Sequence, residues 1–109
     1  MQQWDLRTLD AEAHHPEVLQ SDGEGRAILL LLPADERLQE HQVHERAWLV
    51  VVDGEIEIGH AGEVVRGEPG TLAVFAPNEP REVRARSDAR LLLLLAPWPG
   101  EGHPSLRAA

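Results

Sequence analysis

The amino-acid sequence predicts a single all-β domain, a barrel or sandwich of short strands. Three observations predict this fold class. The apolar residues occur in short runs of strand length, such as AILLLL and LLLLLA. Clusters of Gly, Pro, Asn and Asp separate these runs at regular intervals, as turns do. No segment combines a helical apolar stripe with an N-cap and a C-cap, so helices are not expected.

The length of 109 residues allows one domain with one hydrophobic core. We expect residues 18–96 to form the barrel, with residues 1–17 packed on it as an N-terminal arm and residues 97–109 as a C-terminal tail. No apolar run approaches the roughly 18 residues that span a bilayer, and no signal-like leader opens the chain. We therefore expect a cytoplasmic protein with no membrane partner.

The expected strands follow from runs rich in β-branched or aliphatic residues between turn signals. Two of these runs, residues 27–32 and 90–96, are apolar throughout, which predicts strands buried on both faces. Asp53-Gly54 is a strong hairpin signal. Strands are expected at residues 18–19, 27–32, 39–53, 55–58, 64–65, 71–76, 81–86 and 90–96.

The composition excludes several kinds of chemistry. A net charge of -9 argues against a nucleic-acid partner, because binding to phosphates depends on clustered cations. The chain has no cysteine, and all ten of its cations are arginine. Thiolate nucleophiles, disulfides and lysine Schiff bases are therefore absent. The histidines at 60 and 103 lie in a turn and in the tail, where we expect them to be solvated.

Residues 35–54 and 70–83 resemble the two sequence motifs of the cupin family, and the resemblance covers residues 18–96. In the first motif, Gly, His-x-His, Glu and Gly stand at fixed spacing. The chain places Asp35 at the first Gly, His41 and Val43 at the two His, Ala47 at the Glu and Gly54 at the closing Gly. The resemblance implies a cupin-type double-stranded β-helix, a jelly-roll barrel in a single domain.

The second motif has Gly, Pro-x-Gly, His and Asn at fixed spacing. Here the chain begins at Gly70 and carries Ala76, Asn78, Arg81 and Ala85 at the remaining positions. Asn78, like Asp35 in the first motif, replaces a glycine, and both residue types tolerate a left-handed backbone. Of the four positions that hold a metal in the family, only His41 keeps a metal-binding side chain.

Strand phase predicts which side chains face the barrel interior. Residues two apart on a strand share a face, so the apolar Val83 places Arg81 on the inner face. The same parity groups His41, Val43 and Ala47. We therefore expect a ligand pocket lined by His41, Val43, Ala47 and Arg81.

A first function class is a binding module that holds a small molecule in the barrel without metal. A buried guanidinium beside His41 favours a small carboxylate or other oxyanion through bidentate hydrogen bonds. A competing interpretation pairs Arg81 with Glu45 or Glu79 at the rim, in which case it binds no ligand.

A second function class is a metal-dependent enzyme, of the dioxygenase or isomerase type that the resemblance implies. Its candidate ligands are His41, His44 and Glu45 for zinc, iron, manganese or nickel. His44 has the parity of the outer face and joins this set only if a bulge near Glu45 shifts the strand phase. The sequence leaves both function classes open, and with them whether the protein is an enzyme.

We also expect a two-fold homodimer. Residues 27–32 and 91–95 are hydrophobic on both faces, more than the interior of one small barrel requires. Trp48 has the parity of the outer face, where a second sheet or subunit would cover it.

Overall fold

A computed structural model of the chain describes residues 1–13, 15–22, 24–41 and 44–96, with the backbone alone for residues 39–41. Because this part of the chain contains no helix, it contains none that is long and apolar enough to cross a membrane. The strands are β1 (Glu17–Ser21), β2 (Arg26–Leu32), β3 (Arg37–His41), β4 (Arg46–Asp53), β5 (Ile56–His60), β6 (Glu63–Gly67), β7 (Leu72–Phe75), β8 (Arg81–Ala85) and β9 (Ala89–Ala96).

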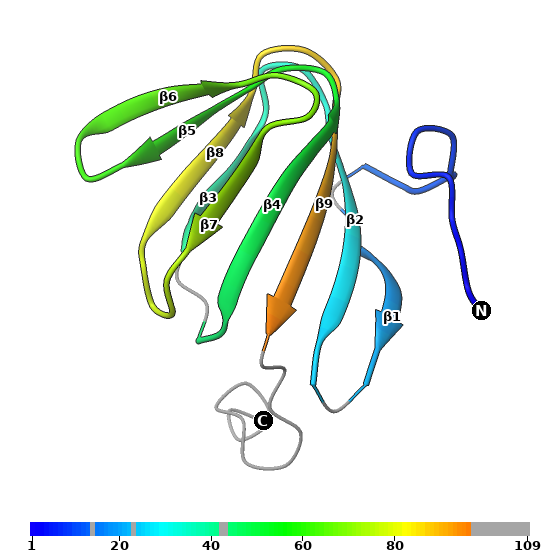
Figure 1. Cartoon of the computed structure of the whole chain (residues 1–109). Helices are drawn as coiled ribbons and strands as arrows, with labels where there is room; N and C mark the ends of the chain where they lie inside the picture. The colour runs from blue at the N-terminus through cyan, green and yellow to red at the C-terminus, as the bar shows by residue number, and fades with distance from the viewer. Residues whose placement is uncertain (14, 23, 42–43, 97–109) are drawn as a thin grey trace.

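The strands form two antiparallel sheets that enclose the interior of the barrel (Figure 1). The larger sheet has the order β1-β2-β9-β4-β7, and the smaller has the order β3-β8-β5-β6. From β2 onward the chain changes sheet at every step except between β5 and β6. This alternation is that of a jelly-roll barrel, so the predicted all-β fold is confirmed.

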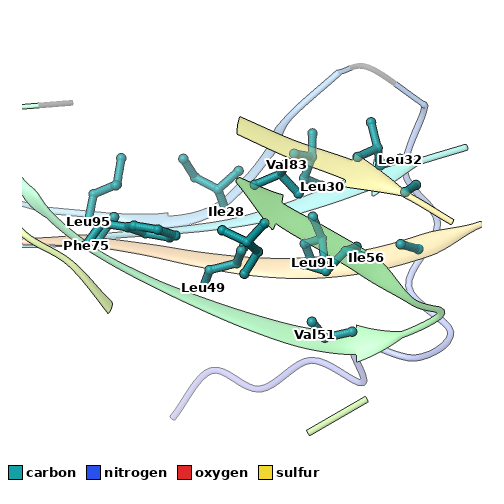
Figure 2. Packing of buried hydrophobic residues seen from close by; sticks show 14 residues of the cluster. Ile28, Leu30, Leu32, Leu49, Val51, Ile56, Phe75, Val83, Leu91 and Leu95 are labelled. Carbon is teal, nitrogen blue, oxygen red and sulfur yellow. The ribbon is translucent and has the colours of Figure 1, made fainter. Parts of the chain in front are cut away.

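The hydrophobic core lies between the two sheets (Figure 2). β9 supplies Leu91 and Leu95 from the larger sheet, and the smaller sheet supplies Ile56 and Val83 from the opposite side. In the register of β2 with β9, Leu30 lies opposite Leu91, and both side chains are buried. Antiparallel pairing thus directs every second residue of these strands into one shared core.

The outer face of the larger sheet is partly covered by the chain itself. Leu29 lies opposite Leu92, on the face away from the core, yet it is fully buried. Arg90 shares this face and donates from Nη1 to the carbonyl oxygens of Leu6 and Leu9, at 3.0 and 2.8 Å. These hydrogen bonds hold the N-terminal residues against the sheet. The N-terminal residues thus cover part of its outer face, which partly explains why β2 and β9 are apolar on both faces.

The left-handed backbone predicted at two motif positions is confirmed. Asp35 has a φ of 68° and Asn78 a φ of 64°. Glycine adopts such angles without steric cost, and Asp and Asn tolerate them better than other residues do. The chain therefore keeps the turn geometry of both motifs without the two glycines.

Three turns meet at one end of the barrel, which is called the closed end below (Figure 1). They are the turns at residues 33–36, 53–55 and 86–88. Asp35 N donates to Ala85 O at 2.9 Å, and Arg86 N donates to Glu55 O at 2.8 Å. Glu55 N in turn donates to Ser87 Oγ at 3.0 Å. Hydrogen bonds between turns thus join the two sheets at this end.

The predicted continuous strand at residues 39–53 is wrong. β3 ends at His41 and β4 begins at Arg46, and the two strands belong to different sheets. The chain has to cross from the smaller sheet to the larger one between them, which a single strand cannot do. Strand phase therefore does not carry over from His41 to Ala47, and the two residues have to be placed separately.

Gly54 offers a test of how tightly the closed end is packed. A Cβ on Gly54 would lie 2.2 Å from Asp88 O, whereas a Cβ on Gly62 would meet nothing within 4 Å. Both glycines have a positive φ, 78° and 82°. We expect Gly62→Ala to cost only the left-handed penalty of about 1–2 kcal/mol. Gly54→Ala should cost about 1–3 kcal/mol more through overpacking.

The measurement is the free energy of unfolding in urea for both variants. Equal losses at the two positions would contradict a tightly packed closed end.

Candidate functional site

The structure places two of the four predicted pocket residues in the barrel interior. Ala47 in β4 is fully buried, and Arg81 at the start of β8 is 4% exposed. His41 lies opposite Arg81 in the register of β3 with β8, but its side chain is outside the described part of the structure. Val43 lies outside the described residues altogether.

Arg81 has the orientation that strand phase predicts. Along β8, Arg81, Val83 and Ala85 are buried, while Arg84 between them is exposed. The side chain of an arginine is seldom buried to this degree without a partner for its charge. The burial of Arg81 is therefore the most unusual feature of the barrel interior.

Within the described residues, the Arg81 guanidinium contacts an aromatic ring but has an unsatisfied donor. Its Cζ lies 4.9 Å from the centroid of the Phe75 ring, a cation–π contact that holds the group in place. Its Nη1 is buried and has no hydrogen-bond partner. Burial lowers the pKa of Arg81 from its ordinary value, and the nearby charge of Glu79 raises it. An arginine keeps its proton at neutral pH even so.

Of the predicted alternative, a pairing of Arg81 with Glu45 or Glu79, the structure does not show the pairing with Glu79. Glu79 Oε1 accepts a hydrogen bond from Ala76 N at 2.7 Å, and Oε2 pairs with His60 Nε2. Both carboxylate oxygens are thus engaged elsewhere, and Glu79 acts on Arg81 only through its charge. His60 is the last residue of β5, so its predicted place in a turn is wrong, and it pairs with Glu79 while 42% of its side chain remains exposed.

The predicted metal ligands at the crossing between β3 and β4 differ in their exposure. Glu45 is buried, with 3% of its surface exposed, whereas His44 is exposed. Among the residues that the structure describes, no three His, Asp or Glu side chains lie close enough together to hold a metal ion. The side chain of His41, the third predicted ligand, is outside that set.

A cavity of about 220 Å³ adjoins Arg81 inside the barrel. Apart from Arg81, every described residue that lines it is apolar. Pro16, just before β1, is the exposed member of the lining. The aliphatic side chains come from both sheets and are those of Leu30, Leu38, Leu49, Val83, Leu91 and Leu93. A single fixed cation beside an apolar cavity is suited to a ligand with one anionic group and a nonpolar body.

Comparison with known proteins shows which family the chain belongs to. The family model "Cupin domain" matches residues 28–97, so the chain is a member of the cupin family. A search of curated proteins finds no match.

Solved structures share the fold at low sequence identity. An RmlC-like cupin protein from Desulfovibrio desulfuricans has 22% identity and a TM-score of 0.80, covering 89% of this chain and 97% of that one. An RmlC-like cupin family protein with a double-stranded β-helix fold from Methanocaldococcus jannaschii has 18% identity and a TM-score of 0.73. There the coverage is 92% of this chain and 90% of that one.

The described residues do not fit the four-ligand metal site that the family motifs imply. Ala47 stands at the position of the glutamate and has no donor atom. Arg81 stands at the position of the last histidine, and its fixed positive charge repels a divalent cation. Two of the four ligand positions of that site are therefore occupied by side chains that cannot bind a metal ion.

Sequence reasoning missed two contributors to this site. Phe75 shares the inward parity of Ala73 on its strand, so strand phase would have placed its ring in the barrel interior, although not beside Arg81. The pairing of His60 with Glu79 joins the end of β5 to the turn between β7 and β8, 19 positions later in the chain. The sequence pattern around these two residues does not predict that contact.

The unsatisfied guanidinium leads to a prediction about stability. Arg81→Met keeps most of the side-chain volume and removes a buried group that has an unpartnered donor. We expect the free energy of unfolding to rise by about 1–3 kcal/mol, because an unsatisfied buried donor costs that much. Arg84→Met, on the exposed face of the same strand, should change it by less than about 0.5 kcal/mol.

Urea unfolding of the three proteins measures both effects. A clear loss of stability in Arg81→Met would mean that the guanidinium has a structural partner in the folded protein.

Proposed function

We propose that the barrel binds a small organic anion, with Arg81 as the group that holds its negative charge. The observation that carries this proposal is the buried guanidinium with an unpartnered Nη1. Burying such a group without an acceptor costs free energy that the folded protein alone does not recover. A carboxylate or similar oxyanion in the adjoining cavity supplies the missing acceptor.

The contacts of Arg81 support a role in ligand binding rather than in an ion pair with a carboxylate at the surface. Its guanidinium lies against Phe75, which restricts its orientation. The side chain also lines the cavity of about 220 Å³. Glu79, whose charge acts on Arg81, is already bonded to Ala76 and His60. A charge-assisted hydrogen bond in such a dry site is stronger than one between neutral groups.

Binding can be tested by ligand-induced changes in melting temperature, with carboxylates compared with their neutral amides. We expect carboxylates to raise the melting temperature of the wild-type protein and their amides to leave it unchanged. A ligand at 100 times its dissociation constant stabilises by about 2.7 kcal/mol, which such a measurement resolves. The response should disappear in Arg81→Met and persist in Arg84→Met. Equal responses in the wild type and Arg81→Met would rule out the anion site.

A metal-dependent enzyme of the dioxygenase or isomerase type is the alternative function. The observation that favours it is the burial of Glu45, which follows His41 by four positions in the sequence. Metal analysis of protein purified without chelator or histidine tag separates the two functions. Stoichiometric zinc, iron, manganese or nickel that is lost in His41→Ala would favour this alternative over the anion site.

We propose in addition that two copies pair through the outer face of the larger sheet. Trp48 in β4 lies between Val74 of β7 and Leu94 of β9 in the strand register. Val74 and Leu94 are exposed, and a groove of about 580 Å³ runs beside Trp48. Asp22 and Arg26 border the groove, so its polar edge carries both signs of charge. Two-fold pairing of such a surface avoids bringing together only like charges.

The oligomeric state tests this pairing. Light scattering at micromolar concentration should give a dimer for the wild-type protein. Val74→Arg places a charge in the apolar surface and should give a monomer. Val64→Arg, on the exposed side of β6 in the other sheet, should remain a dimer. A wild-type monomer at these concentrations would overturn the proposed pairing.

A further inference from the structure

We infer that the barrel selects one class of anion, a compact apolar monocarboxylic acid of about the size of benzoate. The carboxylate binds Arg81, and the hydrocarbon body lies among the leucines of the cavity. This inference rests on the proposed function and narrows it from small organic anions in general to one chemical class.

The chemistry of the cavity limits the ligand to one polar group. Every described lining residue other than Arg81 is apolar. The backbone groups of β2, β4 and β9 along the cavity are engaged in the ladders of the larger sheet. A second carboxylate or a hydroxyl on the ligand would lose its hydration without gaining a partner. Each unpaired buried polar group costs about 1–3 kcal/mol, and a charged group costs more. Dicarboxylates and polyhydroxylated acids are therefore disfavoured.

The length of the cavity limits the size of the hydrocarbon body. Along β8 the lining extends from Arg81 to Val83, and along β9 from Leu91 to Leu93. Each is a single two-residue step, about 7 Å along a strand. An aromatic ring or a short branched chain fits this length, whereas the extended chain of a long fatty acid does not.

The volume of the cavity agrees with this length. The cavity measures about 220 Å³. An apolar cavity of about 150 Å³ is known to accept benzene and to stay free of water otherwise. The additional volume beside Arg81 accommodates a carboxylate attached to such a ring. A much smaller acid such as acetate would leave most of the apolar surface without contacts.

Burial of the lining residues indicates how the ligand is oriented. Pro16 is exposed, Leu38 and Leu93 are partly buried, and Leu91 is fully buried. The lining thus runs from the surface to the core. With the carboxylate fixed at Arg81, the hydrocarbon body reaches the buried leucines, where each Å² of apolar surface removed from water contributes about 25 cal/mol.

Isothermal titration calorimetry of the full chain at pH 7 tests the inference, with benzoate, benzamide, terephthalate, acetate and inorganic phosphate as probes. Benzamide has the shape of benzoate without its charge, and terephthalate adds a second carboxylate at the far end of the ring. We expect benzoate to bind at least roughly tenfold more tightly than each of the other four, which corresponds to about 1.4 kcal/mol.

Variants of a partly buried lining residue test whether the cavity sets the size limit. Leu93→Phe fills the cavity and should weaken benzoate binding, while Arg81 is left in place. Leu93→Ala enlarges the cavity and should shift the preference from benzoate toward the larger naphthoate. A cooperative thermal transition shows that each variant is folded. If Leu93→Phe does not fold, the change of preference in Leu93→Ala still tests the size limit.

The outcomes separate this inference from the proposed function. If acetate, benzoate and phosphate bind alike and all require Arg81, the anion site is supported and the narrower ligand class is wrong. Terephthalate binding as tightly as benzoate would likewise overturn the narrower class. If no acid binds in a manner that depends on Arg81, the proposed function is wrong, and this inference with it.

Discussion

The pairing of β9 between β2 and β4 is the constraint on which the rest of the barrel depends. This register places Leu91 opposite Leu30 and Val51, and Leu95 opposite Ala47. Because side chains alternate between the two faces of a strand, a slip of one residue would turn the core leucines outward. The two apolar runs of the chain meet in this pairing, which fixes both the core and the walls of the cavity.

Arg81 is a buried charged residue beside this apolar core. Removing a guanidinium from water costs several kcal/mol. The cation–π contact with Phe75 recovers about 0.5–2 kcal/mol, and the charge of Glu79 contributes at longer range. A hydrophobic residue at this position would avoid the free-energy cost of removing a charged group from water. The stability of the barrel therefore gives no reason for an arginine here, whereas the proposed binding of an anion does.

The sequence predicted the features that depend on local chemistry. Turn residues and strand runs follow from neighbouring residues alone, and the left-handed positions Asp35 and Asn78 follow from their residue types at the two motif glycines. The burial of Arg81 was predicted too, because it needs only the parity of one strand. The break between β3 and β4 was not predicted, since residues 39–53 carry no strong turn signal at the crossing. The contacts of Phe75 with Arg81 and of His60 with Glu79 were missed because each joins segments of the chain that only the folded topology brings together.

The hydrogen-bonded turns of the closed end lie at the opposite ends of the strands from Arg81. β8 begins at Arg81 and ends at Ala85, which accepts a hydrogen bond from Asp35 N. β4 likewise begins beside Glu45 and ends at Asp53, next to Gly54. The contacts that join the two sheets are thus separated along each strand from the residues of the proposed anion site. Because of this separation, mutations at the rim near Arg81 can replace a set of metal ligands with an arginine. The hydrogen-bonded turns of the closed end preserve the fold meanwhile. Divergence of chemistry on a constant scaffold is a consequence of that division.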